Sequence, residues 1–126
     1  MTSQLHTGIK GKLEKIVAPK DTATAYGSGL VEVFATPAMI ALMENTAHTS
    51  LKEYLPEGFL TVGSDVNIKH IKATAVGKRV WAVSEITLIE GKKLTFSVEA
   101  FDEDGKIGFG THTRYIVNKQ RFMESL

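Results

Sequence analysis

The stretch that decides the fold is TPAMIALMENTAHTSLKEYLPEGF, residues 36–59. It begins like a helix, because Thr36 supplies a side-chain cap and Pro37 suits the first helical position, where its missing N–H costs nothing. A Pro-x-Gly segment marks its end. Apolar residues recur at helical spacing and predict one buried face: Met39, Ile40, Met43, Ala47, Leu51 and Tyr54. We therefore predict a helix from about Thr36 to Leu55.

The bulk properties predict a single domain, residues 1–126, with one core. Hydrophobic residues make up 43% and charged residues 23%, the usual globular balance. The net charge is +1 and basic residues are scattered, so nucleic acid is not an expected partner. No apolar run could span a bilayer and no signal-peptide core is present, so we expect no membrane partner and a cytoplasmic location.

The absence of cysteine excludes disulfides, thiolate zinc sites and cysteine nucleophiles. The four histidines show no metal-ligand spacing. We therefore expect no metal.

Alternating polarity predicts five strands, at residues 9–17, 60–73, 78–90, 92–101 and 106–118. An Asp-Gly pair marks a hairpin between the last two. One strand, a long helix and four strands in hairpin order form an α+β pattern. The simplest packing wraps a curved antiparallel sheet of about five strands around the helix, which is the hot-dog architecture. Such a sheet leaves an exposed edge, so we expect a homodimer.

Two polar residues interrupt these apolar patterns. Glu44 lies at the edge of the helical stripe, and a period of two places His70 on one strand face with Val62, Ser64, Val66 and Ile68. Each also has a structural interpretation, since Glu44 could reach water or pair with His48, and a lone core histidine often bonds a backbone carbonyl. A carboxylate and an imidazole approaching one core favour acid–base or nucleophilic chemistry.

Two further segments are candidates for binding. Thr36 caps the helix, and a helix N-terminus beside a pocket also stabilises negative charge. In the last strand one face holds Gly108, Gly110, His112 and Arg114, opposite Ile107, Phe109, Tyr115 and Val117 unless a bulge shifts the parity. Alternate glycines indicate close approach of another backbone or a ligand. Arg114 could bind a carbonyl or phosphate, or be a solvated or interface charge.

Three blocks, VEVFATPAMIALMENTA (residues 31–47), VGSDVNIKHIKATAVG (62–77) and GFGTHTRYIV (108–117), resemble hot-dog thioesterases of the fluoroacetyl-CoA thioesterase type. The resemblance implies an acyl-CoA thioesterase with catalytic Thr36, Glu44 and His70. It also implies that Gly63 lies at the substrate carbonyl and that Arg114 contacts the substrate. It further implies a dimer with its active site at the interface, and no cofactor beyond the CoA of the substrate.

One segment departs from the family. The fluoroacetyl-specific member carries phenylalanines just before the helix, forming a lid, whereas this chain has AYGSGLVEVF, with Gly27 and Leu30 at those places. We therefore expect hydrolysis of a small acyl-CoA without fluoroacetyl selectivity. Whether Glu44 attacks the carbonyl directly or activates water stays open.

Two rival functions are also compatible with parts of the sequence. Asp65, Asn67 and His70 match the residue spacing of the (R)-enoyl-CoA hydratase motif. That motif precedes its long helix, whereas this segment follows it, and in a regular strand Asp65 and His70 face opposite ways. A non-catalytic protein that binds acyl-CoA or another small ligand is the second rival, because a pocket with Glu and His can bind without turnover.

Overall fold

The computed structural model describes residues 4–126, so the first three residues of the predicted domain lie outside the described part. The elements follow in the order β1 (Lys10–Ile16), a 3₁₀ helix (Pro19–Asp21), α1 (Ala23–Tyr26), α2 (Thr36–Thr49), β2 (Phe59–His70), β3 (Arg79–Glu90), β4 (Lys93–Asp102), β5 (Gly105–Asn118) and α3 (Lys119–Glu124). All five predicted strands are confirmed, with ends that shift by at most three residues.

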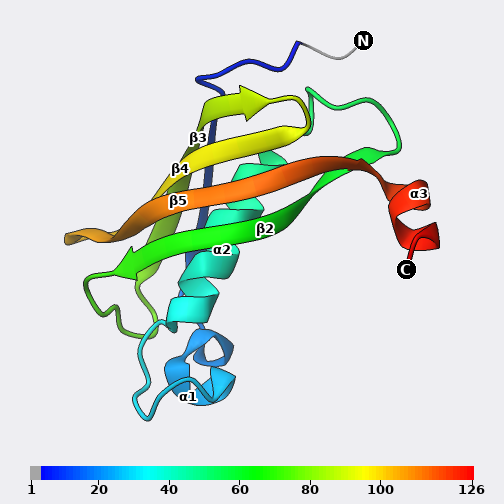
Figure 1. Ribbon diagram of the computed structural model, residues 1–126. Helices are drawn as coiled ribbons and strands as arrows, with labels where there is room; N and C mark the ends of the chain where they lie inside the picture. The colour runs from blue at the N-terminus through cyan, green and yellow to red at the C-terminus, as the bar shows by residue number, and fades with distance from the viewer. Residues whose placement is uncertain (1–3) are drawn as a thin grey trace.

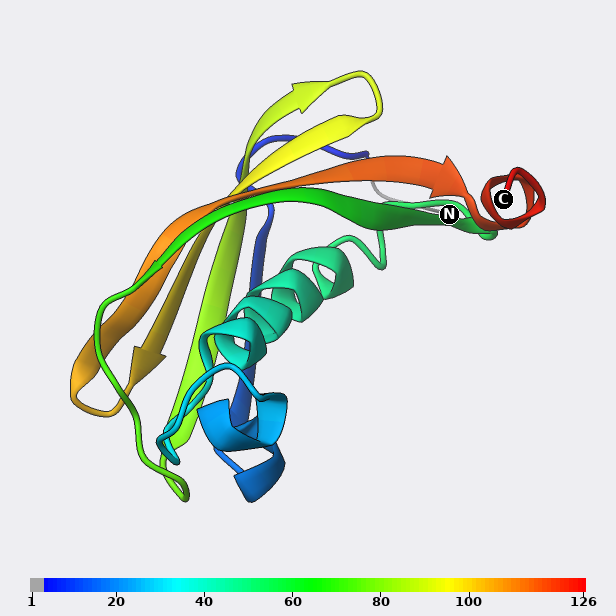
Figure 2. The same ribbon diagram turned by 60° about the horizontal axis from the view of Figure 1, so that its bottom comes forward.

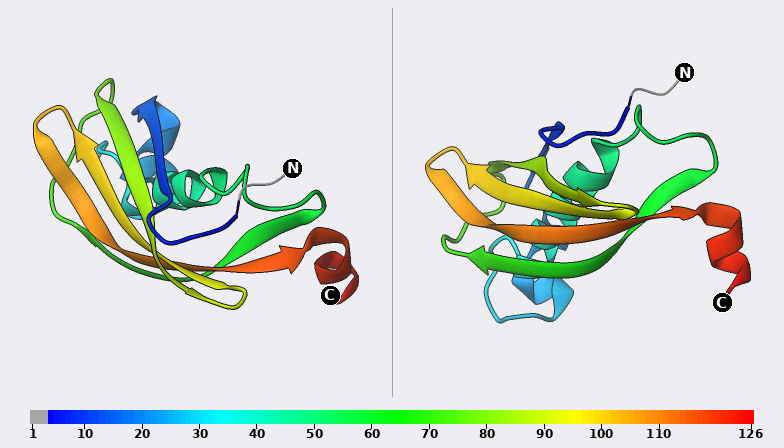
Figure 3. Two further views of the ribbon diagram at one scale, coloured as in Figure 1. Left: turned by 90° about the horizontal axis from the view of Figure 1, so that it is seen from above. Right: turned by 45° about the horizontal axis from the view of Figure 1, so that its top comes forward.

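The five strands form one antiparallel sheet in the order β1-β3-β4-β5-β2. The sheet arches over α2, which lies along its concave side (Figures 1 and 2). The predicted α+β architecture, a curved sheet around one helix, is therefore confirmed. The short helix α3, capped by the Asn118 side chain, extends past the end of β5 (Figure 3). No helix within residues 4–126 is long and apolar enough to cross a membrane.

The core lies between α2 and the inner face of the sheet. The helix buries Ala38, Met39, Leu42, Met43, Thr46 and Ala47. Side chains on the central strands alternate as a one-sided sheet requires. The buried members are Val80, Ala82, Ser84 and Ile86 on β3, with Leu94, Phe96, Val98 and Ala100 on β4. This packing holds α2 at a fixed place beneath the sheet.

The helix ends six residues earlier than predicted, at Thr49 instead of Leu55. The Ser50 hydroxyl donates to the Ala47 carbonyl at 2.6 Å, and the next amides bond three residues back instead of four. A serine that bonds the preceding turn competes with the helical ladder, so the chain continues as tight turns. Leu51 nevertheless stays fully buried, as the periodicity predicted.

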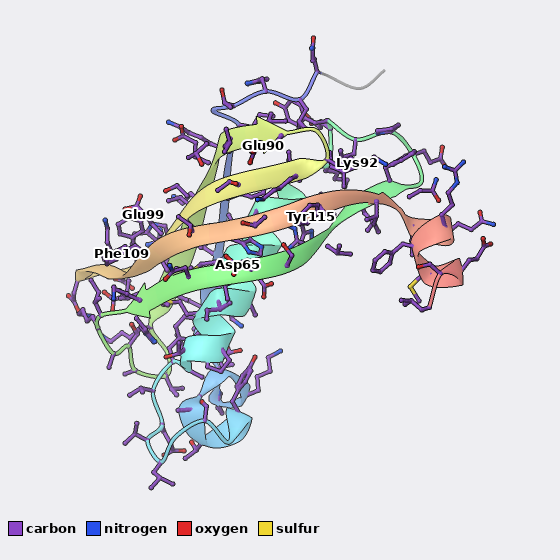
Figure 4. All side chains as sticks on the ribbon, viewed as in Figure 1. Asp65, Glu90, Lys92, Glu99, Phe109 and Tyr115 are labelled. Carbon is purple, nitrogen blue, oxygen red and sulfur yellow. The ribbon has the colours of Figure 1, made fainter. Side chains whose placement is uncertain are left out.

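A β-bulge in β2 changes which side chains face the helix. Gly63 pairs with Arg114 and Asp65 pairs with Thr113, so Ser64 is an extra residue without a partner. A bulge reverses the alternation beyond it. The inner face of β2 therefore carries Thr61 and Gly63 before the bulge and Val66, Ile68 and His70 after it. The prediction that Val62 and Ser64 share a face with His70 was wrong. Figure 4 shows Asp65 on the outer face.

The two glycines of β5 allow close approach, as predicted. A Cβ at Gly108 would lie 2.5 Å from Met39 Sδ of α2, and one at Gly110 would lie far closer to the Asn67 carbonyl oxygen of β2 than van der Waals contact allows. The prediction that Gly108, Gly110, His112 and Arg114 share one face of β5 is confirmed, and this face is the inner one. Phe109 and Tyr115 lie on the outer face, also as predicted (Figure 4). The prediction fails for Ile107, which is fully buried because the β4–β5 register shifts beside it.

The close approach at Gly110 predicts a stability effect. Gly110→Ala should lower the free energy of unfolding by about 2 kcal/mol or more, because the neighbouring atom belongs to backbone that cannot move without disturbing the β2–β5 pairing. Urea unfolding measures the loss. Thr111→Ala, on the exposed face of the same strand, is the control and should change stability by less than about 0.5 kcal/mol. Equal midpoints for Gly110→Ala and the wild type would contradict this packing.

Candidate active site

Thr36 and His70 form the first group of candidate catalytic side chains. The Thr36 Oγ1 atom lies 2.8 Å from His70 Nδ1, at the junction of the α2 N-terminus and the end of β2. Thr36 is the first helical residue and Ala35 holds the N-cap position without a side-chain bond, so Pro37 is the second helical residue. The predicted capping role of Thr36 was therefore wrong, because its hydroxyl bonds the imidazole of a distant strand instead.

The other ring nitrogen of His70 lacks a hydrogen-bond partner among the described residues. His70 Nε2 is buried and makes no hydrogen bond with any of residues 4–126. Burial lowers the pKa of His70, so the neutral imidazole predominates at neutral pH. The pair lines a pocket of about 370 Å³ together with Ser28, Lys72 and other residues of the segments flanking α2 and β2. A neutral imidazole at the wall of a pocket can accept or deliver a proton.

Glu44, Gly63 and Arg114 form the second group, on the concave side of the sheet. The position that a Cβ of Gly63 would occupy lies 3.0 Å from Glu44 Oε2, 3.1 Å from Arg114 Nη1 and 3.1 Å from His112 Cε1. Glu44 is half-buried and Arg114 is 7% exposed. A carboxylate, a guanidinium and an imidazole therefore surround a backbone position that has no side chain.

Arg114 is held by three hydrogen bonds inside the sheet. Its Nε donates to Thr61 Oγ1 at 2.7 Å, its Nη2 to the Thr61 carbonyl at 2.9 Å, and its Nη1 lies 3.0 Å from His112 Nε2. Burial lowers the pKa of Arg114 and the nearby Glu44 charge opposes that shift. Because arginine starts far above neutral pH, the buried group keeps its charge.

A groove of about 570 Å³ opens beside this second group. Arg114 and Thr61 line it together with His48 and Lys52 of the segment around the end of α2. Its remaining wall is mostly apolar: Leu51, Leu55, Phe59 and Leu60. The groove combines basic side chains with apolar surface and carries no acidic side chain among its lining residues. It can accommodate an apolar ligand with a polar or anionic part.

A single chain does not bring all the predicted residues together. Thr36 and Glu44 are eight residues apart on one helix, about 12 Å along its axis. Gly63 and His70 are seven residues apart on one strand, about 20 Å or more. The structure thus joins Thr36 with His70 and Glu44 with Gly63 and Arg114, as two separate groups.

The sequence interpretation missed His112 and Thr61, which hold Arg114. The alternation of the last strand predicts that His112 and Arg114 share one face, and this parity was the available signal. The residues that match the hydratase motif do not form one site, because Asp65 points outward (Figure 4) whereas His70 lies on the inner face. Residues 4–126 contain no cluster of three or more His, Cys, Asp or Glu side chains that could hold a metal ion.

A curved five-stranded sheet around one helix, with polar side chains where the helix meets the edge strand, defines a hot-dog protein. The family model described as fluoroacetyl-CoA-specific thioesterase matches residues 17–120. The chain therefore belongs to the fluoroacetyl-CoA-specific thioesterase family, a family of thioester hydrolases, and the family prediction is confirmed.

Known relatives agree with this placement. The fluoroacetyl-CoA thioesterase of Streptantibioticus cattleyicolor is 35% identical over 91 residues, which span 72% of this chain and 66% of that protein, just under two thirds of its length. A solved structure of a fluoroacetyl-CoA thioesterase is 29% identical and superposes with a TM-score of 0.92, over 98% of this chain and 96% of that chain. A variant solved in complex with fluoroacetate and CoA is 29% identical, with a TM-score of 0.86 over 94% of this chain and 99% of that one.

The histidine environments predict how stability depends on pH. Burial lowers the pKa of both His70 and His112, so below about pH 6.5 the unfolded chain binds protons that the folded chain does not. The free energy of unfolding should therefore fall as the pH drops from 7 toward 5, by at most about 1.4 kcal/mol per pH unit for each histidine.

Urea unfolding at several pH values between 5 and 8 measures this slope. This pH range also separates the effect of the histidines from that of Asp21 and Asp102. The pKa values of these two carboxyl groups are lowered, so their contributions to the free energy of unfolding are lost only at more acidic pH. His112→Gln should flatten the slope. A wild-type stability that rises on acidification from pH 7 to 5 would contradict the assigned burial of these imidazoles.

Proposed function

We propose that the protein hydrolyses a small acyl-CoA to the free acid and CoA, without selectivity for fluoroacetyl-CoA. The observation that carries the proposal is the placement of the Glu44 carboxylate beside Gly63 and the buried Arg114. The segment before α2 supports the lack of fluoroacetyl selectivity, because Leu30 is 96% exposed and Gly27 has no side chain. The proposed reaction needs water and no cofactor. A cytoplasmic location stays a prediction from the sequence.

We also propose that two chains form a homodimer that completes each active site. The edge strand β2 has no neighbour on its outer side in the sheet of residues 4–126, and its central Val66 is 41% exposed. Antiparallel pairing of two β2 strands about a two-fold axis at Asn67 would place His70 of one chain opposite Gly63 of the other, because each lies three ladder positions from Asn67 when the unpaired Ser64 is left out. Isologous pairing of this kind is the commonest form of dimer symmetry.

In such a dimer the Thr36–His70 pair of one chain would face the Glu44–Gly63–Arg114 group of its partner. The substrate carbonyl would lie against the open backbone at Gly63, with Arg114 stabilising the negative charge of the tetrahedral intermediate. Glu44 would attack the carbonyl carbon or activate a water that does so.

Collapse of the intermediate would then break the C–S bond. His70, oriented by Thr36, would take up a proton from the attacking water or from solvent, deliver it to the departing thiolate and return to its neutral form. With a glutamyl anhydride, a water would next cleave the anhydride and regenerate the carboxylate. Both routes convert thioester and water into acid and thiol.

The first test is thiol release from short, branched and aromatic acyl-CoAs. Glu44→Gln and His70→Ala should each lower kcat/KM by about two orders of magnitude or more, close to 3 kcal/mol of transition-state stabilisation. Thr111→Ala is a folded control on the outer face. If no substrate releases thiol, or if Glu44→Gln is as active as the wild type, the proposal fails. An absorbance change of an enoyl-CoA without thiol release would instead support the hydratase.

A mixing experiment tests whether active sites are shared between chains. Glu44→Gln and His70→Ala are each inactive as homodimers in this scheme. After the two variants are unfolded together and refolded, half of the dimers are mixed, and each mixed dimer has one intact composite site, so about a quarter of wild-type activity should return. If each chain supplied its own complete site, every site would carry a substitution and activity would stay at the level of the variants.

A further inference from the structure

His112 is the most enclosed titratable side chain on the inner face of the sheet that the proposed reaction does not use. It is 1% exposed and lies on β5 with the Phe96 ring of β4 tilted beside it, the ring centroids being 6.3 Å apart. Its Cε1 atom lies 3.1 Å from the position that a Gly63 side chain would occupy. His112 therefore lies directly behind the group formed by Glu44, Gly63 and Arg114.

The two neighbours of His112 determine its tautomer. Its Nδ1 lies 2.8 Å from the Asp65 carbonyl oxygen, which can only accept, so Nδ1 carries a hydrogen. Its Nε2 lies 3.0 Å from Arg114 Nη1, which can only donate, so Nε2 must present a lone pair. Only the neutral imidazole with hydrogen on Nδ1 satisfies both contacts. The anchoring carbonyl comes directly after the bulge at Ser64.

The guanidinium is fixed by His112 on one side and by Thr61 on the other. Thr61 accepts from Nε and Nη2, and His112 accepts from Nη1, the nitrogen that approaches Gly63. Without the imidazole, Nη1 would lose its only hydrogen-bond acceptor among residues 4–126. His112 therefore controls the nitrogen that faces the proposed carbonyl position.

We propose that His112 is a positioning residue, which holds Arg114 against Gly63 and Glu44 only while its imidazole is neutral with hydrogen on Nδ1. The proposal rests on the proposed thioesterase function. The charged groups that face His112 are Arg114 on its own strand and Glu44 on α2, the Asp65 carboxylate of β2 acts from the outer face, and β4 contributes the uncharged Phe96. Protonation of Nε2 turns the acceptor into a donor and sets it against the guanidinium, so the contact with Arg114 breaks in acid.

Two amide substitutions separate the two contacts of His112. His112→Gln keeps an oxygen that can accept from Arg114, and His112→Asn keeps an N–H that can donate to the Asp65 carbonyl. We expect kcat/KM for the acyl-CoA with the fastest thiol release to fall about tenfold or more in His112→Asn and less than about threefold in His112→Gln. Urea unfolding of each variant shows whether it is folded at the assay pH.

The double-variant comparison shows whether His112 acts through Arg114. In an Arg114→Gln background, His112→Asn should change kcat/KM by less than about twofold, because the partner it positions is already gone. The acid limb of the kcat/KM profile that comes from His112 should also disappear in His112→Gln. A full tenfold loss in the Arg114→Gln background, or equal losses in folded His112→Asn and His112→Gln, would overturn the positioning role.

A readout that does not need activity tests the tautomer itself. Nitrogen-15 NMR of the wild-type imidazoles at pH 7 should show His112 neutral with hydrogen on Nδ1. Hydrogen on Nε2, or a doubly protonated ring, would overturn the inference. The two proposals fail differently: a wild type that releases no thiol overturns the proposed function, whereas an active wild type matched by His112→Asn overturns only the role of His112.

Discussion

The extra residue Ser64 in β2 is the constraint on which the inner surface of the sheet depends. In a regular strand, residues seven apart face opposite ways, so Gly63 and His70 would lie on different sides of the sheet. The bulge restores them to one face and keeps Thr61 in line with both. It also brings the Asp65 carbonyl to the ring of His112. One unpaired residue thus places Thr61, Gly63 and His70 of β2 on the side that α2 covers, where His112 and Arg114 of β5 also lie.

A buried arginine makes this arrangement costly unless its hydrogen bonds are satisfied. Removing a guanidinium from water costs several kcal/mol, and well-packed apolar residues would fill the same space with equal or greater stability. Arg114 nevertheless lies 93% out of solvent with three of its donors bonded. A buried guanidinium beside a carboxylate and a glycine is typical of a site that stabilises developing negative charge. The alternate glycines Gly108 and Gly110 then let β5 lie close enough to α2 and β2 to enclose that charge.

The sequence predicted the parts of this fold that depend on periodicity. The helix, the five strands and the shared face of Gly108, Gly110, His112 and Arg114 follow from periods of 3.6 and 2. It could not predict the bulge, because Ser64 resembles any exposed strand residue. It assigned Thr36 to a cap from local context, whereas a hydrogen bond to His70, 34 residues away, determines the role of that hydroxyl. The pairing of His112 with Arg114 was equally hidden, since parity shows that two side chains share a face but not that they bond.

The two groups of candidate site residues differ in charge and in hydrogen bonding. The group at Thr36 and His70 is uncharged at neutral pH and contains a nitrogen without a hydrogen-bond partner among residues 4–126, whereas the group at Glu44 and Arg114 holds both charges and a bonded network. Opposite charges and their supporting hydrogen bonds must be fixed within one folded chain, because a buried guanidinium without its acceptors would be unstable before any assembly. A neutral imidazole carries no such requirement, so the half-buried His70 is compatible with a folded single chain. In the proposed dimer, this division would let each chain fold with its buried charge satisfied, and the partner chain would supply the proton-transfer group across the edge strand.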